Sequence, residues 1–420
     1  MGTILFFTFM GCLALGVPIA FSIAAAGIVT IIAGDVNLLI VVQRLFASTD
    51  SFSLVAIPYF ILAGDLLARG QMSKTLVAFA EACLGKMKGG LSAVSVLASM
   101  FFAAISGSGA ATTAAVGSSM IPELEKRGYE VDRSAALIAA GGCIGVVIPP
   151  SVPMVLYAVI AEQSVTRLFK NGFFPGFMMG GILIAISLYQ AKKLKYPDGK
   201  AFSFKNMIAT FKVAIWSLIM PLIILGGIFS GYFTPSEAAG VAVVYSMFAS
   251  MFIYRDLTLK ELGQIILGSG RTSAVIMIII ACSGIFGWAL ANWQIPEVIA
   301  EGVLAISSNK YIILSLIAVI VLIAGVFMET SSAIILLTPV FLPLIKMLGI
   351  DLIHFGLIFT IGIAIGMITP PVAIDLFVAS SITGLPIEQI SKKVVPYLIG
   401  LIIVFFIYIY LPIFIPSLIL

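Results

Sequence analysis

The chain has 420 residues, of which 61% are hydrophobic and 10% are charged, and its mean hydropathy is +1.19. A soluble domain carries about 25% Asp, Glu, Lys and Arg, so this composition excludes a soluble enzyme, a nucleic-acid-binding protein and a disordered chain. The apolar stretches run without alternation, which excludes a transmembrane β-barrel. We therefore predict an all-α polytopic membrane protein, whose net charge of +4 is too small to indicate a polyanionic partner.

Apolar segments and polar interruptions predict two halves of similar length. The first half, 1–190, is predicted to contain scaffold helices over 1–70, an amphipathic arm at 72–87, a helical hairpin at 89–124, a broken helix at 133–163 and a helix at 172–191. A basic cytoplasmic linker is predicted at 191–212. The second half, 213–420, is predicted to contain scaffold helices over 213–254 and 271–292, a hairpin at 310–346, a broken helix at 352–384 and a helix at 395–418.

The two halves are related by an internal duplication. Shifting the sequence by 221 positions, the difference between Pro122 and Pro343, also places Gly145 on Gly366 and the double proline at 149–150 on that at 370–371. Further upstream the shift drifts by a few residues. One constant shift over more than fifty residues that repeatedly matches glycine and proline indicates a structural repeat.

The basic residues are consistent with an inverted repeat. If the linker is cytoplasmic, each half crosses an odd number of times and the hairpins are re-entrant, 23 Lys and Arg residues can be assigned to faces. All except Arg44, Arg167, Lys170, Lys310 and Lys346 are then cytoplasmic, as the positive-inside rule requires.

Two kinds of polar interruption lie inside apolar sequence, and each occurs once per half. One is the predicted hairpin tip, SGSGAATT at 106–113 and METSS at 328–332. The other is a double proline, GVVIPPS at 145–151 and GMITPP at 366–371. Irregular backbone at membrane depth is tolerated where it is buried in protein or lines a watery cavity. The four breaks are therefore the predicted transport site, in the pattern of a secondary transporter.

The breaks offer both cation and anion ligands. Proline lacks an N–H, so carbonyls around Gly145 and Gly366 are expected to lose helical partners and to suit Na⁺. Helix N-termini at the tips suit a substrate carboxylate. The alternative for each element is packing, since a proline kink can be satisfied by neighbours and small residues mark close helix contacts. The symmetric pairing of all four favours the functional interpretation.

Acidic residues inside apolar sequence are candidate functional groups because their burial is costly. Glu329, at the second tip, is the preferred carboxylate. Asp375 is either functional or a buried hydrogen-bonding group, and Asp65 is interpreted as an interfacial ion pair with Arg69 at i+4. Glu237 is predicted to cap a helix. The sequence contains no HExxH motif, phosphate loop or ATP-binding domain, so we predict a transporter and not an enzyme.

Four segments resemble a known family: ISGSGAATTAAVGSSMIPEL (105–124), GCIGVVIPPSVPMVLY (142–157), GYFTPSEAA (231–239) and GMITPPVAIDLF (366–377). They are similar to the large membrane subunit (M subunit, DctM-like) of TRAP transporters, the tripartite ATP-independent periplasmic carriers. The resemblance covers essentially the whole chain. It implies Na⁺-driven uptake of an organic acid, of the C4-dicarboxylate or sialic acid class, across a bacterial inner membrane. It also implies an elevator motion of the hairpins and broken helices against the scaffold.

The resemblance further implies partners and site residues. The partners are a periplasmic substrate-binding protein (P type) and a small membrane subunit (Q type), expected here as a separate polypeptide. The implied substrate site comprises Ser108, Ser151, Thr330 and Glu329. The first implied Na⁺ site comprises Ser106, Ser108, Gly145, Ile148 and Pro150, and the 221-residue shift gives Phe327, Glu329, Gly366, Thr369 and Pro371 for the second.

Two other functions are compatible with the same features. One is a stand-alone Na⁺- or H⁺-coupled anion transporter or exchanger of the same broad fold group, which needs no binding protein. The other is a structural membrane subunit, which has no use for two symmetric pairs of polar interruptions. The substrate itself cannot be named from the sequence.

Overall fold

The computed structural model describes residues 1–68, 71–84, 89–197, 203–306 and 309–414, and every regular element in these ranges is helical. Seven helices are long and apolar enough to cross a membrane. An eighth span results if Leu39–Ala47 and Phe52–Ala68, which meet at a bend of 59°, are counted as one. The predicted all-α membrane fold class is confirmed, with two helical hairpins and two broken helices in place.

The described residues of the first half contain ten α-helices, with a short 3-10 turn before α4 and another after α8. They are α1 (Gly2–Ala14), α2 (Ile19–Ala33), α3 (Leu39–Ala47), η1 (Phe52–Val55), α4 (Ala56–Ala68), α5 (Gln71–Leu84), α6 (Gly90–Ser106), α7 (Gly109–Lys126), α8 (Val131–Gly142), η2 (Cys143–Val146), α9 (Val152–Ile160) and α10 (Val165–Lys193).

The part of the second half that the structure describes contains nine α-helices, with a π-helical turn after α12. They are α11 (Phe204–Phe229), α12 (Pro235–Phe248), η3 (Ala249–Ile253), α13 (Leu259–Asn292), α14 (Ile295–Ile306), α15 (Lys310–Phe327), α16 (Thr330–Met347), α17 (Leu352–Gly366), α18 (Ile374–Thr383) and α19 (Ile387–Phe414). Adding 221 to the bounds of α7 gives the bounds of α16, and adding it to the first residue of α8 gives the first residue of α17.

Three long helices begin earlier than their apolar segments indicate. We expected helices from 172, 213 and 271, but α10, α11 and α13 begin at Val165, Phe204 and Leu259. The hydroxyls of Ser164, Ser203 and Thr258 accept N–H groups of the first turn, so each helix extends outward through a polar cap. The predicted linker 191–212 accordingly shrinks to the residues between Lys193 and Phe204.

The predicted cap at Glu237 is confirmed. Thr234 and Glu237 form a reciprocal capping box at the start of α12, in which each side chain satisfies a backbone N–H of the other residue. Thr258 and Glu261 form the same arrangement at the start of α13.

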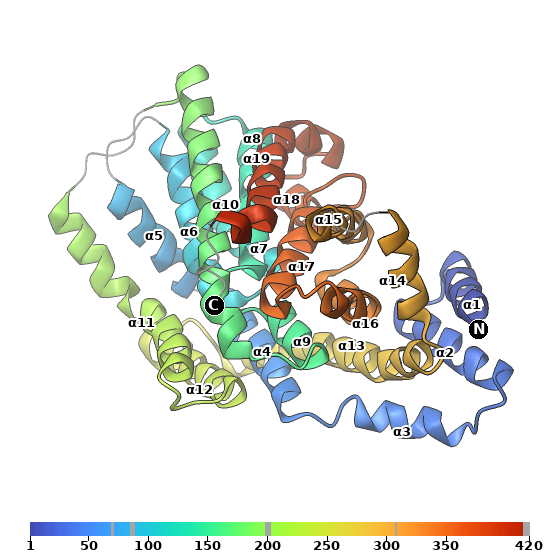
Figure 1. The fold of residues 1–420 in the computed structure, drawn as a ribbon. Helices are drawn as coiled ribbons and strands as arrows, with labels where there is room; N and C mark the ends of the chain where they lie inside the picture. The colour runs from blue at the N-terminus through green and yellow to red at the C-terminus, as the bar shows by residue number, and fades with distance from the viewer. Residues whose placement is uncertain (69–70, 85–88, 198–202, 307–308, 415–420) are drawn as a thin grey trace.

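The hairpins and broken helices occupy the middle of the molecule (Figure 1). In that view α11 and α12 lie at the lower left, α1 to α3 lie at the lower right, and α13 runs between them above α3. α13 packs against both α2 and α4. We call α6 to α10 and α15 to α19 the core, and α1 to α4 and α11 to α13 the scaffold.

Contacts between the halves are exchanged in pairs. α9 packs against α16 and α18 against α7, while α19 packs against α8 and α10 against α17. In the scaffold, α2 packs against α13 and α12 against α4. Each contact between a helix of one half and a helix of the other recurs between the counterparts of those two helices. A two-fold relation between the halves accounts for this pattern.

Close backbone contact within the core requires glycine at two facing positions. A Cβ on Gly366 would lie 2.4 Å from the backbone carbon of Gly325, and a Cβ on Gly325 would lie 2.8 Å from the backbone of Ile363. The second hairpin therefore rests directly on the helix that leads into the second break.

We expect Gly366→Ala to lower the free energy of unfolding by about 1–3 kcal/mol, because the added methyl group collides with backbone that cannot turn aside. Gly181→Ala in α10 is the matched control. Its Cβ would meet nothing within 4 Å, so it should be neutral or stabilise by up to about 1 kcal/mol. The thermal unfolding temperature of the purified chain in detergent measures both effects. Equal changes in the two variants would contradict the close contact.

Candidate functional site

The first hairpin tip is a two-residue turn between α6 and α7. Gly107 has φ +64°, and Ser108 caps α7 by accepting the Ala111 N–H at 3.4 Å. A Cβ on Gly107 would lie 2.7 Å from the carbonyl oxygen of Pro150. Glycine is needed here both for the left-handed backbone and for this contact with the first broken helix.

Neutral oxygens gather on the inner side of the first tip. The Ser106 hydroxyl lies 3.0 Å from the Thr112 hydroxyl, which donates to the Ser108 carbonyl at 2.8 Å. Gly145 in η2 faces the same group, because a Cβ there would lie 2.4 Å from the Thr112 hydroxyl oxygen and 2.6 Å from the Ser108 carbonyl oxygen. Three of the five residues of the first implied Na⁺ site, Ser106, Ser108 and Gly145, therefore lie together.

The second tip has a charged cap in the same place. The Glu329 carboxylate accepts the N–H groups of Ser331 and Ser332 at 2.9 and 3.2 Å, and the Ser331 hydroxyl at 3.1 Å. Thr330 is buried, and its hydroxyl lies 3.0 Å from the Met367 sulfur at the second break. The positive N-terminus of α16 is thus neutralised by the protein's own carboxylate, whereas the N-terminus of α7 carries a neutral cap.

The two breaks differ from the sequence-based expectation in one respect. Three carbonyls around the double prolines have partners: Val146 accepts the Ser151 hydroxyl at 2.6 Å, Gly366 accepts the Thr369 N–H at 2.9 Å, and Met367 accepts the Asp375 N–H at 3.1 Å. Side chains and the following turn replace the missing proline donors. A carbonyl oxygen has two lone pairs, so these groups can still face a cation through the second one.

A cavity of about 360 Å³ lies where the two tips meet the scaffold. It is lined by the first tip (Ser106, Gly107, Ser108, Gly109, Ala110, Ala111), the second tip (Glu329, Thr330, Ser331), α4 (Ile61, Gly64, Asp65), α13 (Thr272, Ile276) and the breaks (Val146, Val152, Pro153, Met367, Ile374). The core supplies most of the wall, and the scaffold supplies one side.

The charges around this cavity are all negative among the described residues. Asp65 and Glu329 line it, and no lysine or arginine does. The Asp65 carboxylate also accepts the Ser269 hydroxyl of α13. The predicted ion pair of Asp65 with residue 69 involves a residue outside the described part of the chain. In the sequence, the signal for a role in the cavity is that Asp65 is an acidic residue within the apolar run of α4.

The other implied site residues do not line the cavity. Ser151 is fully buried, and its hydroxyl is used both by Val146 and as the cap of α9. Ile148, Pro150, Thr369 and Pro371 lie in the breaks, and the Phe327 side chain is 64% exposed. The structure brings Ser106, Ser108, Glu329 and Thr330 to one cavity, and the remaining residues of the implied sites do not line it.

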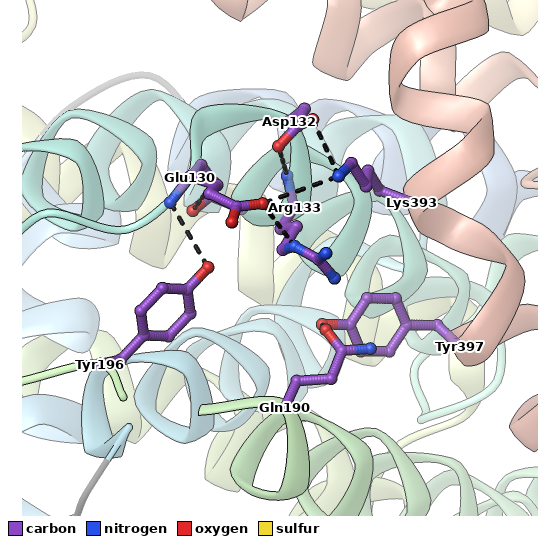
Figure 2. Close-up of polar contacts among 8 residues, drawn as sticks. Glu130, Asp132, Arg133, Gln190, Tyr196, Lys393 and Tyr397 are labelled. Carbon is purple, nitrogen blue, oxygen red and sulfur yellow. Dashed lines mark hydrogen bonds and ion pairs between the residues drawn. The ribbon is translucent and has the colours of Figure 1, made fainter. Parts of the chain in front are cut away.

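A second polar cluster lies at the N-terminal end of α8 (Figure 2). None of its residues lines the cavity. Lys393 of α19 lies 3.7 Å from Glu130 and 3.5 Å from Asp132, and Glu130 also pairs with Arg133. Tyr397 of α19 donates to Gln190 of α10 at 3.1 Å. These partly exposed ion pairs connect core helices of both halves and are each worth about 0–1 kcal/mol.

The fold and the cavity define a helical membrane transport protein whose site lies between paired helical hairpins. A family model described as the tripartite ATP-independent periplasmic transporter, DctM component, matches residues 6–414. The chain therefore belongs to the DctM family, the large permease component of TRAP transporters, which resides in the bacterial inner membrane. Its relatives are named as permeases, in agreement with the prediction that it is not an enzyme.

Three comparisons illustrate the relationship. The chain is 41% identical to the C4-dicarboxylate TRAP transporter large permease protein of Pseudomonas aeruginosa, over 88% of this chain and 86% of that one. It is 40% identical to the isethionate TRAP transporter permease protein DctMQ of Oleidesulfovibrio alaskensis, over 97% of this chain and 65% of the longer relative. Its fold resembles the YdaH transporter of Alcanivorax borkumensis, with a TM-score of 0.66 and 14% identity over 91% and 90% of the two chains.

We expect Ser108→Cys to react with a hydrophilic thiol reagent and Ser151→Cys to stay unreactive, because only the first side chain lines the cavity. The half-exposed Cys12 and Cys83 should first be replaced by serine, and the buried Cys143 and Cys282 can remain. Mass spectrometry of the purified chain counts the adducts. Modification of Ser151→Cys at the rate of Ser108→Cys would contradict this placement of the two hydroxyls.

Proposed function

We propose that this chain is the transport subunit of a Na⁺-coupled, binding-protein-dependent uptake system for a small organic acid. The supporting observation is the charge of the cavity between the tips. Two carboxylates and no basic side chain line it among the described residues. An organic anion placed there is repelled unless cations enter with it, so binding of the anion is coupled to binding of the cations.

The two tips carry different caps and therefore suit ligands of opposite charge. The N-terminus of α7 places the backbone N–H groups of Gly109 and Ala110 beside the cavity and has only a neutral serine cap, which suits a substrate carboxylate. Glu329 already occupies the N-terminus of α16 and adds a negative charge that suits Na⁺. The neutral oxygens of Ser106, Ser108 and Thr112 supply a second cation-binding group beside the first tip.

We infer that transport proceeds by an elevator-type movement of the core. Both tips and both breaks belong to the core, so most of the cavity wall would move as one body. On the scaffold side, Gly64 of α4 has no side chain where the first tip comes close: a Cβ there would lie 2.9 Å from the Ser106 carbonyl oxygen. The absence of a side chain at that point would allow the tip to move past α4.

Relatives support the substrate class without identifying the substrate. Their names specify C4-dicarboxylates, isethionate, 2,3-diketo-L-gulonate and sialic acid. A cavity of about 360 Å³ lies within the usual range for small-molecule sites, about 300–1,000 Å³. We propose a small organic anion delivered by a periplasmic binding protein, with a small membrane subunit braced against the scaffold.

Reconstitution in liposomes tests this function. The chain, a small membrane subunit and a cognate binding protein encoded beside it should accumulate a labelled organic anion only when Na⁺ is higher outside. The anion is chosen by screening ligands of the binding protein. Accumulation that persists without the binding protein, or with K⁺ in place of Na⁺, would reject the proposal in favour of a stand-alone carrier.

We expect Glu329→Ser to weaken Na⁺ dependence while preserving the fold. Serine is a good helix cap and is the residue at the equivalent position of the first tip, Ser108. The variant thus removes the charge and keeps the cap. The Na⁺ concentration for half-maximal uptake should rise roughly tenfold or more, the effect of losing about 1.4 kcal/mol of binding free energy, with little change in unfolding temperature.

Two further variants complete that test. Glu329→Asp keeps charge and cap and should retain Na⁺-dependent uptake, whereas Glu329→Ala removes both and should also lower stability by about 1 kcal/mol. If Glu329→Ser shows wild-type Na⁺ dependence, the carboxylate is only a helix cap.

A further inference from the structure

A second carboxylate is buried inside the core, away from the cavity lining. Asp375 lies in the first turn of α18 and is 0% exposed. Neither of its carboxylate oxygens has a hydrogen-bond partner, and it is the one carboxylate among the described residues of which both oxygens are buried and unpartnered. It also forms no ion pair in the described parts of the chain. An uncompensated buried charge is strongly unfavourable, so this carboxyl group requires either a proton or a bound cation.

The Thr113 hydroxyl on α7 shares this environment. It is fully buried and unpartnered, although a helical threonine can bond to the carbonyl four residues earlier. Its neighbour Thr112 does so with the Ser108 carbonyl at 2.8 Å. The two threonines therefore face different regions. Thr112 faces the inner side of the first tip, and Thr113 faces the interface with α8 and α18.

Oxygens of three helices converge on one small volume beside Gly142 of α8. The point where a Gly142 Cβ would stand lies 1.9 Å from the Thr113 hydroxyl, 3.0 Å from the Gly109 carbonyl and 3.1 Å from one Asp375 oxygen. The corresponding point on Gly109 lies 3.0 and 3.3 Å from the two Asp375 oxygens and 3.3 Å from the Gly142 carbonyl. These oxygens face a common space and form no hydrogen bonds with one another. Oxygen ligands of a bound cation are arranged in the same way.

The duplicated interface shows that packing does not require these polar groups. Subtracting 221 from Asp375 gives Met154 of α9, and adding 221 to Thr113 gives Ile334 of α16. α9 packs against α16 as α18 packs against α7, and Met154 and Ile334 are both fully buried. The same helix contact is thus built with apolar side chains in one copy and with a carboxylate and a hydroxyl in the other.

The glycines follow the same asymmetry. Gly109 and Gly142, which leave the space around Asp375 open, correspond to Thr330 and Ile363 in the other half. A side chain at Gly109 or Gly142 would fill the volume on which the oxygens converge. The open space and the polar groups therefore occur together, and only in this copy of the interface.

We propose that Asp375 and Thr113, with the carbonyl oxygens of Gly109 and Gly142, bind a monovalent cation, Na⁺. One carboxylate among neutral oxygens balances a single positive charge, and hard oxygen ligands do not favour transition metals. No cluster of three His, Cys, Asp or Glu side chains that could hold a metal occurs in the described part of the chain. This site uses none of the residues assigned above to the other Na⁺ sites.

The position of the site gives it a role in transport, which rests on the proposed Na⁺ coupling. Gly109 and Thr113 lie in the first turns of α7, next to Ser108 of the cavity wall. A cation held between α7, α8 and α18 would fix the first tip relative to both broken helices. Its binding would therefore favour the tip conformation that receives substrate.

Equilibrium binding of ²²Na⁺ to the purified full-length chain tests the proposal directly. Asp375→Asn keeps the shape and should remove one bound Na⁺ per chain. Thr113→Val should weaken binding at this site roughly tenfold, as loss of one ligand does, and Thr113→Ser should restore it. The matched controls are Asp132→Asn in the α8 cluster and Thr338→Val, because Thr338 is likewise buried and unpartnered but lies away from Asp375. Both controls should bind Na⁺ as the wild type does.

The outcomes separate this site from the proposed function. Wild-type ²²Na⁺ stoichiometry and affinity in both Asp375→Asn and Thr113→Val would overturn the site. Retained Na⁺ binding together with an altered pH profile of uptake would also overturn it, because that result would assign a proton to Asp375. If Asp375→Asn does not fold, the Thr113 pair decides. Uptake independent of Na⁺ by a wild-type chain that still binds this ion would instead reject the coupling and leave the site standing.

Discussion

Backbone hydrogen bonding in an apolar environment is the constraint on which the structure depends. A helix inside a membrane can end only where another group satisfies its free N–H and C=O groups. This chain interrupts its helices at two hairpin tips and two double prolines, and each interruption is closed by a specific partner: Ser108 and Glu329 cap the tips, and Ser151 and Thr369 satisfy carbonyls at the breaks. Ser108 and Glu329, which cap the tips, also line the cavity between them, whereas Ser151 and Thr369 lie outside its lining.

Duplication explains the framework, and departures from it explain the chemistry. The helices that carry the tips and breaks repeat with a constant shift, and their contacts are exchanged between the halves. The pairs that differ in charge, polarity or size include Ser108 and Glu329, Met154 and Asp375, Thr113 and Ile334, and Gly142 and Ile363. A symmetric scaffold can place two half-sites at similar depth, but an anion and its accompanying cations need different ligands. The differences between the copies supply those ligands.

The scarcity of charge makes each remaining charge inside the core meaningful. Glu329 is partly satisfied by N–H groups of its own helix, Asp65 by a scaffold serine, and Asp375 by nothing in the described chain. An interior with little positive charge of its own favours either protonation of buried carboxylates or cations bound beside them. This charge distribution supports the proposal of cation coupling.

The sequence by itself determined the helical membrane class, the duplication, and the positions of the tips and breaks, because these depend on local properties: apolar length, missing proline donors and glycine turns. Ser106, Ser108, Glu329 and Thr330, which the sequence and its family resemblance indicate at the two tips, line the cavity. Helix starts at Val165, Phe204 and Leu259 were missed because polar caps lie outside the apolar windows. Only the tertiary structure decided that Asp65 joins the cavity, that Ser151 does not, and that Asp375 meets Thr113. Those outcomes depend on which distant helices approach each other, a distance that no local pattern encodes.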